Sequence, residues 1–525
     1  MGIYLNPDGE AFEIAVQSNI YVDKTGMLAY LNSVLGKEQR FVCVSRPRRF
    51  GKSIAANMVS AYYSRMSDTK KIFHGLAIAE EVSFQHYAGK YDVIHLNMQD
   101  FLSNTATMDE MLSLLQRSVL WDILKEYPDD DYFDRTNLMR TMSDVYQNTK
   151  RRFVIVIDEW DCVFREYKER TEDQRRYLDF LRTWMKDKVY IELAYMTGIL
   201  PIKKYGTHSA LNMFNEFSME NPGKLAEFVG FTGNEVEELC RKYGVSYEEC
   251  KAWYDGYSFP AQGVREIYNP RSVVSAMENG FFDNYWNRTE TFEALKVYID
   301  LDFDGLKEAI IALMSGEWQR INTKNFANDM STFHDKDDVL TLLIHLGYLG
   351  YDFSTSCVFI PNQEILAEYV SSVRSRDWSH VAEAVRASDE LLSSTLNLES
   401  ERVARSIEAA HMETSHLTYN DENALAYTIS LAYYTARRKY LVVREFPTGK
   451  GFADLVYLPR PAHPELPAMI IELKWNKSAK TAIEQIKEKQ YVQALEDYEG
   501  RILLVGISYD KSTRKHVCEI VEWKR

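Results

Sequence analysis

Continuous apolar runs, each followed by a helical stretch, dominate the first 200 residues. Residues 41–45 (FVCVS), 153–157 (FVIVI) and 189–198 are largely apolar, and residues 91–98 have the composition of a further strand. Strands that are apolar throughout are buried on both faces, as in a parallel sheet covered by helices. The pattern therefore predicts an α/β domain built on a parallel sheet.

The middle of the chain is richer in helix and in aromatic residues. It contains the segments 253–259 (WYDGYSF) and 267–273 (IYNPRSV), and Asn269-Pro270 is a favourable helix start. From Asp337 we expect a helix, a hairpin with a strand at 357–360 and a second helix. This order favours a helical, winged-helix-like middle region.

The C-terminal third predicts helices and strands in a different order. We expect helices at residues 398–418, 421–439 and 478–498, and strands at about 441–446, 452–458, 468–473 and 501–508. The whole chain then divides into three predicted domains, 1–290, 291–395 and 396–525.

Length and composition limit the class of protein. A chain of 525 residues accommodates two to four domains, and 46% hydrophobic with 26% charged residues excludes disorder and fibrous repeats. No apolar run is long enough to cross a membrane, and the N-terminus lacks a secretory signal pattern. The six cysteines form no CxxC pair, so we expect free thiols in a cytoplasmic protein.

The net charge of −15 argues against a nucleic-acid-binding surface along the whole chain. Residues 401–525 contain 19 Lys+Arg and 17 Asp+Glu, a balance of +2, so the first 400 residues carry −17. The asymmetry is compatible with a different partner for the C-terminal region.

A phosphate-binding loop is indicated at Gly51-Lys52-Ser53, between a predicted strand and a predicted helix. Such a loop offers backbone N–H groups to phosphates, a Lys to the β/γ charge and a hydroxyl to Mg²⁺. The consensus glycine five residues before Gly51 is replaced by Arg46. The loop also carries Arg48 and Arg49, and these arginines could contact phosphate or nucleic acid or be exposed loop charges.

A distal strand strengthens the nucleotide-binding interpretation, because FVIVI ends in Asp158-Glu159. In this class of ATPase the Asp supports Mg²⁺ and the adjacent Glu polarises the attacking water. Thr197, at the end of the third strand, could place a hydroxyl near the γ-phosphate, or it could be an ordinary strand-end residue.

Several segments together resemble the bacterial AAA-ATPase-like family, whose members usually carry a C-terminal nuclease-like domain. The segments are RPRRFGKS, VIDEWD, YVDKT (21–25), MTGI (196–199), WYDGYSF and IYNPRSV. The resemblance implies a P-loop NTPase fold, ATP bound by Gly51, Lys52 and Ser53, and Asp158 and Glu159 acting on Mg²⁺ and water. Asp23 and Lys24 are signatures without a derived role, and we expect the aromatic residues near Tyr254 and Tyr268 to pack in the interior.

A second group of charged residues is predicted in the C-terminal domain. Glu472 and Lys474 lie two positions apart on one strand and so share a face, and Asp454 lies on the preceding strand. Two carboxylates bind Mg²⁺, the metal lowers the pKa of a bound water, and a lysine stabilises developing negative charge. The alternative is a solvated face with a weak surface ion pair. Gln485 precedes Lys489 by one helical turn, so both could face the same groove.

This group resembles the PD-(D/E)xK nuclease superfamily, although Ala453 stands where the name-giving proline would be. The resemblance implies a restriction-endonuclease-like α/β fold with Asp454, Glu472 and Lys474 as the catalytic core. It also implies Glu422 as a further metal ligand from a preceding helix and Gln485 as the residue on the following helix. Mg²⁺ is the expected metal, with Mn²⁺ as a substitute.

The leading hypothesis is an ATP-binding, probable ATP-hydrolysing protein coupled to a Mg²⁺-dependent nuclease acting on DNA or RNA. One alternative is an ATP-switched regulator that holds nucleic acid without cutting it, and another is a signalling ATPase with a protein partner. A homo-oligomer is compatible with each of them, and no membrane partner is expected.

Overall fold

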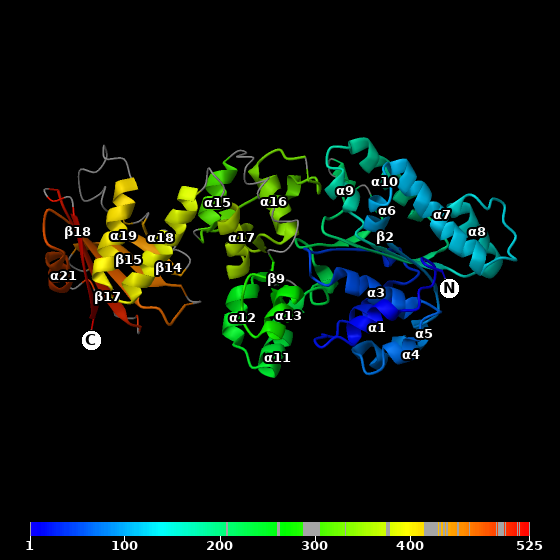
Figure 1. The fold of residues 1–525 in the computed structure, drawn as a ribbon, viewed down its shortest axis with the longest axis horizontal. Helices are drawn as coiled ribbons and strands as arrows, with labels where there is room; N and C mark the ends of the chain where they lie inside the picture. The colour runs from blue at the N-terminus through cyan, green and yellow to red at the C-terminus, as the bar shows by residue number, and fades with distance from the viewer. Residues whose placement is uncertain are drawn as a thin grey trace. The chain divides into compact units, whose positions relative to one another are not determined.

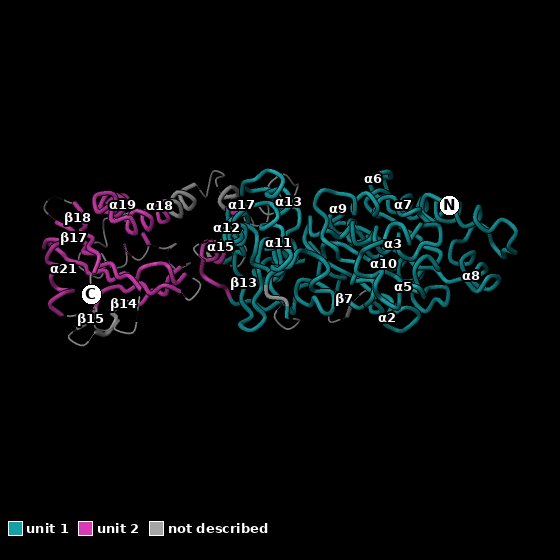
Figure 2. Tube along the Cα trace, turned by 90° about the horizontal axis from the view of Figure 1, so that it is seen from below, with its two compact units in different colours: residues 1–306, 320–368 teal, residues 307–319, 369–525 magenta. Residues whose placement is uncertain are grey.

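The computed structural model describes most of the 525 residues. It describes residues 2–523 except 206–207, 210, 260–262, 287–304, 315, 331, 374–378, 414–428, 430–431, 434–435, 437–438, 449–450, 461–462, 490, 492–497, 499, 512 and 514. The chain folds into two compact units, shown in two colours in Figure 2. Unit 1 comprises residues 1–306 and 320–368, and unit 2 comprises residues 307–319 and 369–525. The domain boundaries at 290 and 395 stay predictions.

A five-stranded parallel sheet forms the centre of unit 1, in the order β2-β3-β4-β1-β7. Its strands are β1 (Phe41–Ser45), β2 (Asp92–Asn97), β3 (Phe153–Asp158), β4 (Ile191–Gly198) and β7 (Asn215–Phe217). The first four confirm the prediction from the apolar runs, and every residue of β1 and β3 is buried. The parallel sheet therefore follows from sequence, apart from the short edge strand β7.

Helices cover both faces of this sheet. Figure 1 shows α1 (Glu10–Val16) and α3 (Lys52–Tyr63) on one side and α7 (Met108–Glu126), α8 (Leu138–Thr149) and α10 (Thr171–Met185) on the other. The shorter helices are α2 (Met27–Val34), α4 (Thr69–Ile72), α5 (Val82–Tyr87), α6 (Met98–Ser103) and α9 (Cys162–Glu166). A two-stranded hairpin, β5 (Lys204–Tyr205) with β6 (His208–Ser209), follows β4.

The rest of unit 1 is built from short elements. Helices α11 (Gly233–Tyr243), α12 (Tyr247–Tyr254) and α13 (Pro270–Asn279) accompany the sheet β8 (Phe231–Thr232), β10 (Val264–Tyr268) and β9 (Tyr257–Phe259). Then come β11 (Gln319–Arg320), α16 (Lys336–Leu346), the hairpin β12 (Gly350–Asp352) and β13 (Cys357–Phe359), and α17 (Gln363–Val373). This is the predicted helix–hairpin–helix order. Tyr254 and Tyr268 are fully buried in one cluster, as expected for packing residues.

Unit 2 contains a mixed five-stranded sheet in the order β14-β15-β16-β17-β18, in which only the β16–β17 pair is parallel. The strands are β14 (Tyr440–Thr448), β15 (Gly451–Pro459), β16 (Ala468–Trp475), β17 (Ile502–Asp510) and β18 (Lys515–Trp523). The helices are α15 (Leu306–Met314), α18 (Ser379–Leu396), α19 (Ser400–Glu413) and α21 (Ala479–Glu488). Most of the predicted helix 421–439 lies outside the described residues.

The two faces of this sheet pack against different helices. Ile471 and Leu473 belong to the core cluster that contains Val403 and Ile407 of α19. Ile470 belongs to the cluster that contains Ile483 and Ile486 of α21. Because side chains alternate along a strand, the even-numbered positions of β16 face α21. This alternation directs Glu472 and Lys474 toward α21.

All six cysteines lie in described parts of the chain and are free thiols, five of them buried, as predicted. No helix in the described ranges is long and apolar enough to cross a membrane.

A buried carboxyl joins helix α13 to helix α17 within unit 1. Glu364 is 1% exposed; its Oε2 accepts a hydrogen bond from Ser272 Oγ at 2.9 Å, and its Oε1 accepts one from Tyr285 N at 2.8 Å. Burial raises the pKa of Glu364 to about 8. Three hydrogen bonds to its carboxylate lower the pKa but do not cancel the effect of burial, and the charge of Glu368 raises the pKa slightly further. Helix α13, which begins at the Asn269 cap as predicted, is therefore held in place by an acid that is largely protonated at neutral pH.

We predict that Glu364→Gln flattens the pH dependence of stability. Between about pH 5 and about pH 8 the folded chain retains a proton that the unfolded chain has lost, so the free energy of unfolding falls as pH rises. The amide needs no proton; it can accept from Tyr285 N and donate to Ser272 Oγ. We expect the variant to be more stable at pH 8 by on the order of 1 kcal/mol in urea unfolding. The exposed Glu248→Gln is the control, and an unchanged pH slope in Glu364→Gln would contradict the assignment.

Candidate functional site

The loop between β1 and α3 has the backbone shape of an anion-binding turn. Arg49 and Gly51 have positive φ values of 69° and 89°, and α3 begins at the next residue, Lys52. A Cβ added at Gly51 would meet no atom within 4 Å, so the left-handed conformation, and not crowding, favours glycine there. The free N–H groups of the first turn of α3 thus lie beside the loop.

The predicted nucleotide residues converge at this loop. Lys52 Nζ donates to Pro47 O at 2.8 Å, and Asp158, at the end of β3, accepts a hydrogen bond from Ser53. Burial lowers the pKa of Lys52, and the charges of Glu159, Asp161 and Asp158 oppose that effect. Burial also raises the pKa of Asp158, while the bond from Ser53 lowers it. The arrangement suits a Mg²⁺ ion, because a hydroxyl and a carboxylate oxygen lie together next to a lysine.

Glu159 has an unusual backbone conformation. Its φ is 51°, in the left-handed region that non-glycine residues rarely adopt, and its side chain is 25% exposed. Its carboxylate pairs with the Arg165 guanidinium. Burial raises the pKa of Glu159, Asp161 raises it further, and Arg165 lowers it.

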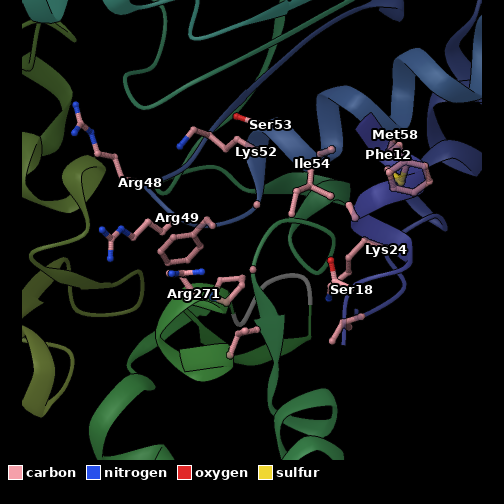
Figure 3. A pocket seen from close by; sticks show the side chains of 18 of the residues that line it. Phe12, Ser18, Lys24, Arg48, Arg49, Lys52, Ser53, Ile54, Met58 and Arg271 are labelled. Atoms are coloured by element: carbon pink, nitrogen blue, oxygen red, sulfur yellow. The ribbon is translucent and has the colours of Figure 1, made fainter. Parts of the chain in front are cut away.

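A cavity of about 1140 Å³ within unit 1 connects these groups. It is lined by Gly51, Lys52, Ser53 and Glu159, and also by residues of α1, of the segment 18–24 and of α13. Figure 3 shows Arg48, Arg49, Lys52 and Arg271 toward one end, and Phe12 and Met58 toward the other together with Lys24, whose ammonium is paired with Glu235. A cavity with several cations at one end and an aromatic and a thioether side chain at the other has the polarity and the size to hold a nucleotide.

Two residues that the sequence predicts to contact the nucleotide make their hydrogen bonds within the protein interior. Arg46 is fully buried, donates through Nη1 to Phe217 O at 3.0 Å and lies over the Phe259 ring at 5.3 Å. Burial lowers the pKa of Arg46 to about 10. Thr197 is also fully buried and donates to Val44 O at 3.1 Å. Neither side chain is among the described cavity-lining residues, so a direct nucleotide contact by either stays a prediction.

The segment that contains Asp23 and Lys24 is fixed on two sides. Lys24 Nζ donates to both carboxylate oxygens of Glu235, at 2.7 and 2.6 Å, and to Glu227 O at 2.7 Å. Asp23 accepts from Ala77 N at 2.7 Å. These contacts hold residues 18–24 as one wall of the cavity, which is a positioning role for both signature residues.

In unit 2, Glu472 is the centre of the second group. It is 1% exposed, and its Oε1 accepts from Lys474 Nζ at 3.0 Å and from Gln485 Nε2. Its Oε2 is buried and has no hydrogen-bond partner among the described residues. One oxygen of the carboxylate is thus held by two donors while the other is available to a ligand.

Asp454 lies beside Glu472 where strands β15 and β16 separate. The paired register ends at Leu455–Ile471, and beyond it Leu473 N donates to Asp454 Oδ2 at 2.7 Å. Burial raises the pKa of Glu472 to about 7, and the Asp454 charge adds to this, while Lys474 and Lys489 lower it. Two adjacent carboxylates, one of them buried with an unbonded oxygen, suit a hard divalent cation.

The structure therefore brings together Asp454, Glu472, Lys474 and Gln485. Glu422 lies outside the described residues. Within those residues no three His, Cys, Asp or Glu side chains form a group that could hold a metal ion, and the carboxylates brought together here are those of Asp454 and Glu472.

Three residues of these sites were not identified from sequence. Arg165 pairs with Glu159, Arg271 lines the cavity from α13, and Tyr491 Oη lies 3.3 Å from Gln485 Nε2. Arg271 lies in the IYNPRSV segment, which carries the family resemblance but no role for this arginine. No sequence motif or residue spacing points to Arg165 or Tyr491. Their contacts depend on the turn at Glu159 and on the chain after α21.

Comparisons with known proteins match two regions of the chain. Residues 10–207 match the family model described as a predicted AAA-ATPase, and residues 421–519 match that of the PD-(D/E)XK nuclease superfamily. An uncharacterized protein of the vnfD 5′ region of Azotobacter chroococcum mcd 1 is 22% identical over 282 residues, 52% of this chain and 51% of that protein. The chain thus spans about half the length of this curated relative.

A solved structure, that of the Aeropyrum pernix ORC2 protein in ADPNP–ADP complexes, aligns at 13% identity with a TM-score of 0.31. The alignment covers 73% of this chain and 100% of that one, but the score is too low to support an argument. The chain therefore combines a region that matches the model of a predicted AAA-ATPase, residues 10–207, with a region that matches the model of the PD-(D/E)XK nuclease superfamily, residues 421–519.

Proposed function

We propose that unit 1 binds and hydrolyses ATP and that unit 2 cleaves phosphodiester bonds of DNA or RNA. The observation that carries the first part is that Lys52, Ser53 and Glu159 line one cavity of about 1140 Å³ and that Asp158 is hydrogen-bonded to Ser53 behind them. The second part is supported by the Glu472 carboxylate, which has one oxygen held by Lys474 and Gln485 and the other unbonded.

In unit 1 the phosphates would lie against the loop and the first turn of α3. Lys52 exchanges its bond to Pro47 O for a phosphate oxygen, since the hydrogen bond that its ammonium makes in the described structure goes to a backbone carbonyl. Ser53 and Asp158 would hold Mg²⁺, which when bound offsets phosphate charge. Glu159 takes the proton of the attacking water as the water oxygen bonds to the γ-phosphorus and the bond to the β–γ bridging oxygen breaks.

In unit 2 Asp454 and Glu472 would hold Mg²⁺ or Mn²⁺. When bound, the metal lowers the pKa of a water and stabilises charge on the phosphate. Lys474 and Gln485 keep Oε1 of Glu472 in place, so the carboxylate turns its other oxygen to the ligand. Lys474 also places a positive charge where the phosphodiester gains negative charge.

The first test of this function is Lys52→Ala. Loss of the ammonium at the phosphate end should lower kcat/KM for ATP by at least about 100-fold. Phosphate release and binding of a fluorescent ATP analogue measure the effect, with the exposed Lys70→Ala as a matched control. Unchanged binding and turnover in Lys52→Ala would rule out this cavity as the ATP site.

The second test is Lys474→Ala, assayed on labelled single- and double-stranded DNA and RNA with Mg²⁺ or Mn²⁺, with and without ATP. We expect cleavage to fall by about 10²–10³-fold, because a buried charge next to the reacting phosphate is removed. The exposed Lys515→Ala should cleave like the parent chain.

Calorimetric measurement of Mn²⁺ binding shows whether a variant has lost cleavage because it no longer binds the metal or because it lacks the lysine. Glu472→Gln should weaken Mn²⁺ binding, whereas Lys474→Ala should retain it. A parent chain that binds nucleic acid but cuts none of the four substrates would instead favour an ATP-switched regulator.

A further inference from the structure

Arg165 is held at the nucleotide cavity by a chain of buried contacts. Its side chain is only 9% exposed, and it pairs with Glu159 and with Asp161, whose Oδ2 lies 3.4 Å from Arg165 Nε. Asp161 is fully buried, and the same Oδ2 accepts from Ile199 N at 3.1 Å and Leu200 N at 2.8 Å. The backbone after β4 thus fixes Asp161, and Asp161 fixes the arginine.

Arg165 lies close enough to Lys52 for the two charges to interact, as do Glu159, Asp161 and Asp158. Arg165 lines the cavity together with Lys52, Ser53 and Glu159. Its charge lowers the pKa of Lys52, after the larger effect of burial, so the two cations interact electrostatically. Arg165 therefore belongs to the same group of charges as the residues proposed for Mg²⁺ and for water.

The other arginines that line the cavity in the described part of the chain are placed differently. Arg48 and Arg49 are half-buried on the loop, and Arg49 Nη1 donates to Tyr285 O at 2.6 Å. Arg271 is exposed on α13. Arg165 differs from these three in being bonded to Glu159, the residue next to Asp158.

We infer that Arg165 is the residue with which this chain recognises the γ-phosphate, an inference that rests on the proposed ATPase function. Without nucleotide, Arg165 neutralises Glu159. With ATP bound, one arm of the guanidinium turns to a γ-phosphate oxygen while another stays on Asp161, which a planar group with five donors permits. Glu159 is then released to accept the proton of water, and Arg165 stabilises the charge of the transition state from within the same chain.

This role predicts a selective loss of affinity. ADP lacks the γ-phosphate, so removal of Arg165 should leave ADP affinity within about 3-fold and lower the affinity for a non-hydrolysable ATP analogue by about 10- to 100-fold. Turnover should fall by about 10³-fold, the low end for an arginine at this position. A residue that only supported the fold would weaken both nucleotides equally.

The experiment measures fluorescent ADP and ATP-analogue binding, and phosphate release, for Arg165→Ala and Arg165→Lys in the full chain. Lysine keeps the positive charge beside the buried carboxylates but cannot bind Asp161 and a phosphate oxygen at the same time. For Arg165→Lys we therefore expect a ratio of ATP-analogue to ADP affinity between those of the parent chain and Arg165→Ala, and a turnover at least about 10-fold below that of the parent chain. The exposed Arg175→Ala is the control. Thermal unfolding checks folding, and Arg165→Lys decides the matter if the alanine variant does not fold.

Three results would overturn the inference. The first is an unchanged ratio of ATP-analogue to ADP affinity in Arg165→Lys and Arg165→Ala. The second is a rise in turnover, which would show that Arg165 only restrains Glu159. The third is a parent chain that binds neither nucleotide, which would overturn the proposed ATPase function as well.

Discussion

Burial of like charges at the carboxyl end of a parallel sheet is the constraint on which unit 1 depends. Asp158 and Asp161, both almost fully buried, lie close to Glu159 at the end of β3. Carboxylates so placed are costly unless cations and N–H groups compensate them. Lys52, Arg165 and the N–H groups of Ile199 and Leu200 after β4 supply that compensation. Of these groups, Lys52 and Arg165 also line the cavity of unit 1, so the cations that stabilise the buried carboxylates border that cavity.

Unit 2 also buries a carboxylate beside a second one, and fewer donors compensate its charge. Glu472 is buried next to Asp454, and its charged form is compensated on one oxygen by Lys474 and Gln485. The compensation is incomplete, because Oε2 has no partner in the described residues and the pKa is raised to about 7. A divalent cation would complete it.

Sequence predicts the parts of the molecule that depend on local pattern. The buried strands β1 and β3 follow from continuous apolar runs, and the shared face of Glu472 and Lys474 follows from the period of two. What it does not predict depends on segments far apart in the chain. In the sequence, Arg46 is one of several cations in RPRRFGKS. In the structure its guanidinium is buried and donates a hydrogen bond to Phe217 O, 171 residues later in the chain. Arg165 pairs with Glu159, whose left-handed backbone conformation has no signal in the sequence. Asp454 reaches Leu473 N because β15 and β16 separate there.

The measurement that tests the account most directly is hydrogen exchange followed by mass spectrometry, with and without a non-hydrolysable ATP analogue and Mg²⁺. The loop 46–51 and the first turn of α3 should exchange more slowly in the presence of the analogue, because phosphate oxygens would accept from their N–H groups. The peptide across Asp158 to Arg165 should change at the same nucleotide concentration. Saturable nucleotide binding with exchange unchanged in both segments would contradict the account, because ATP would then bind at a different place.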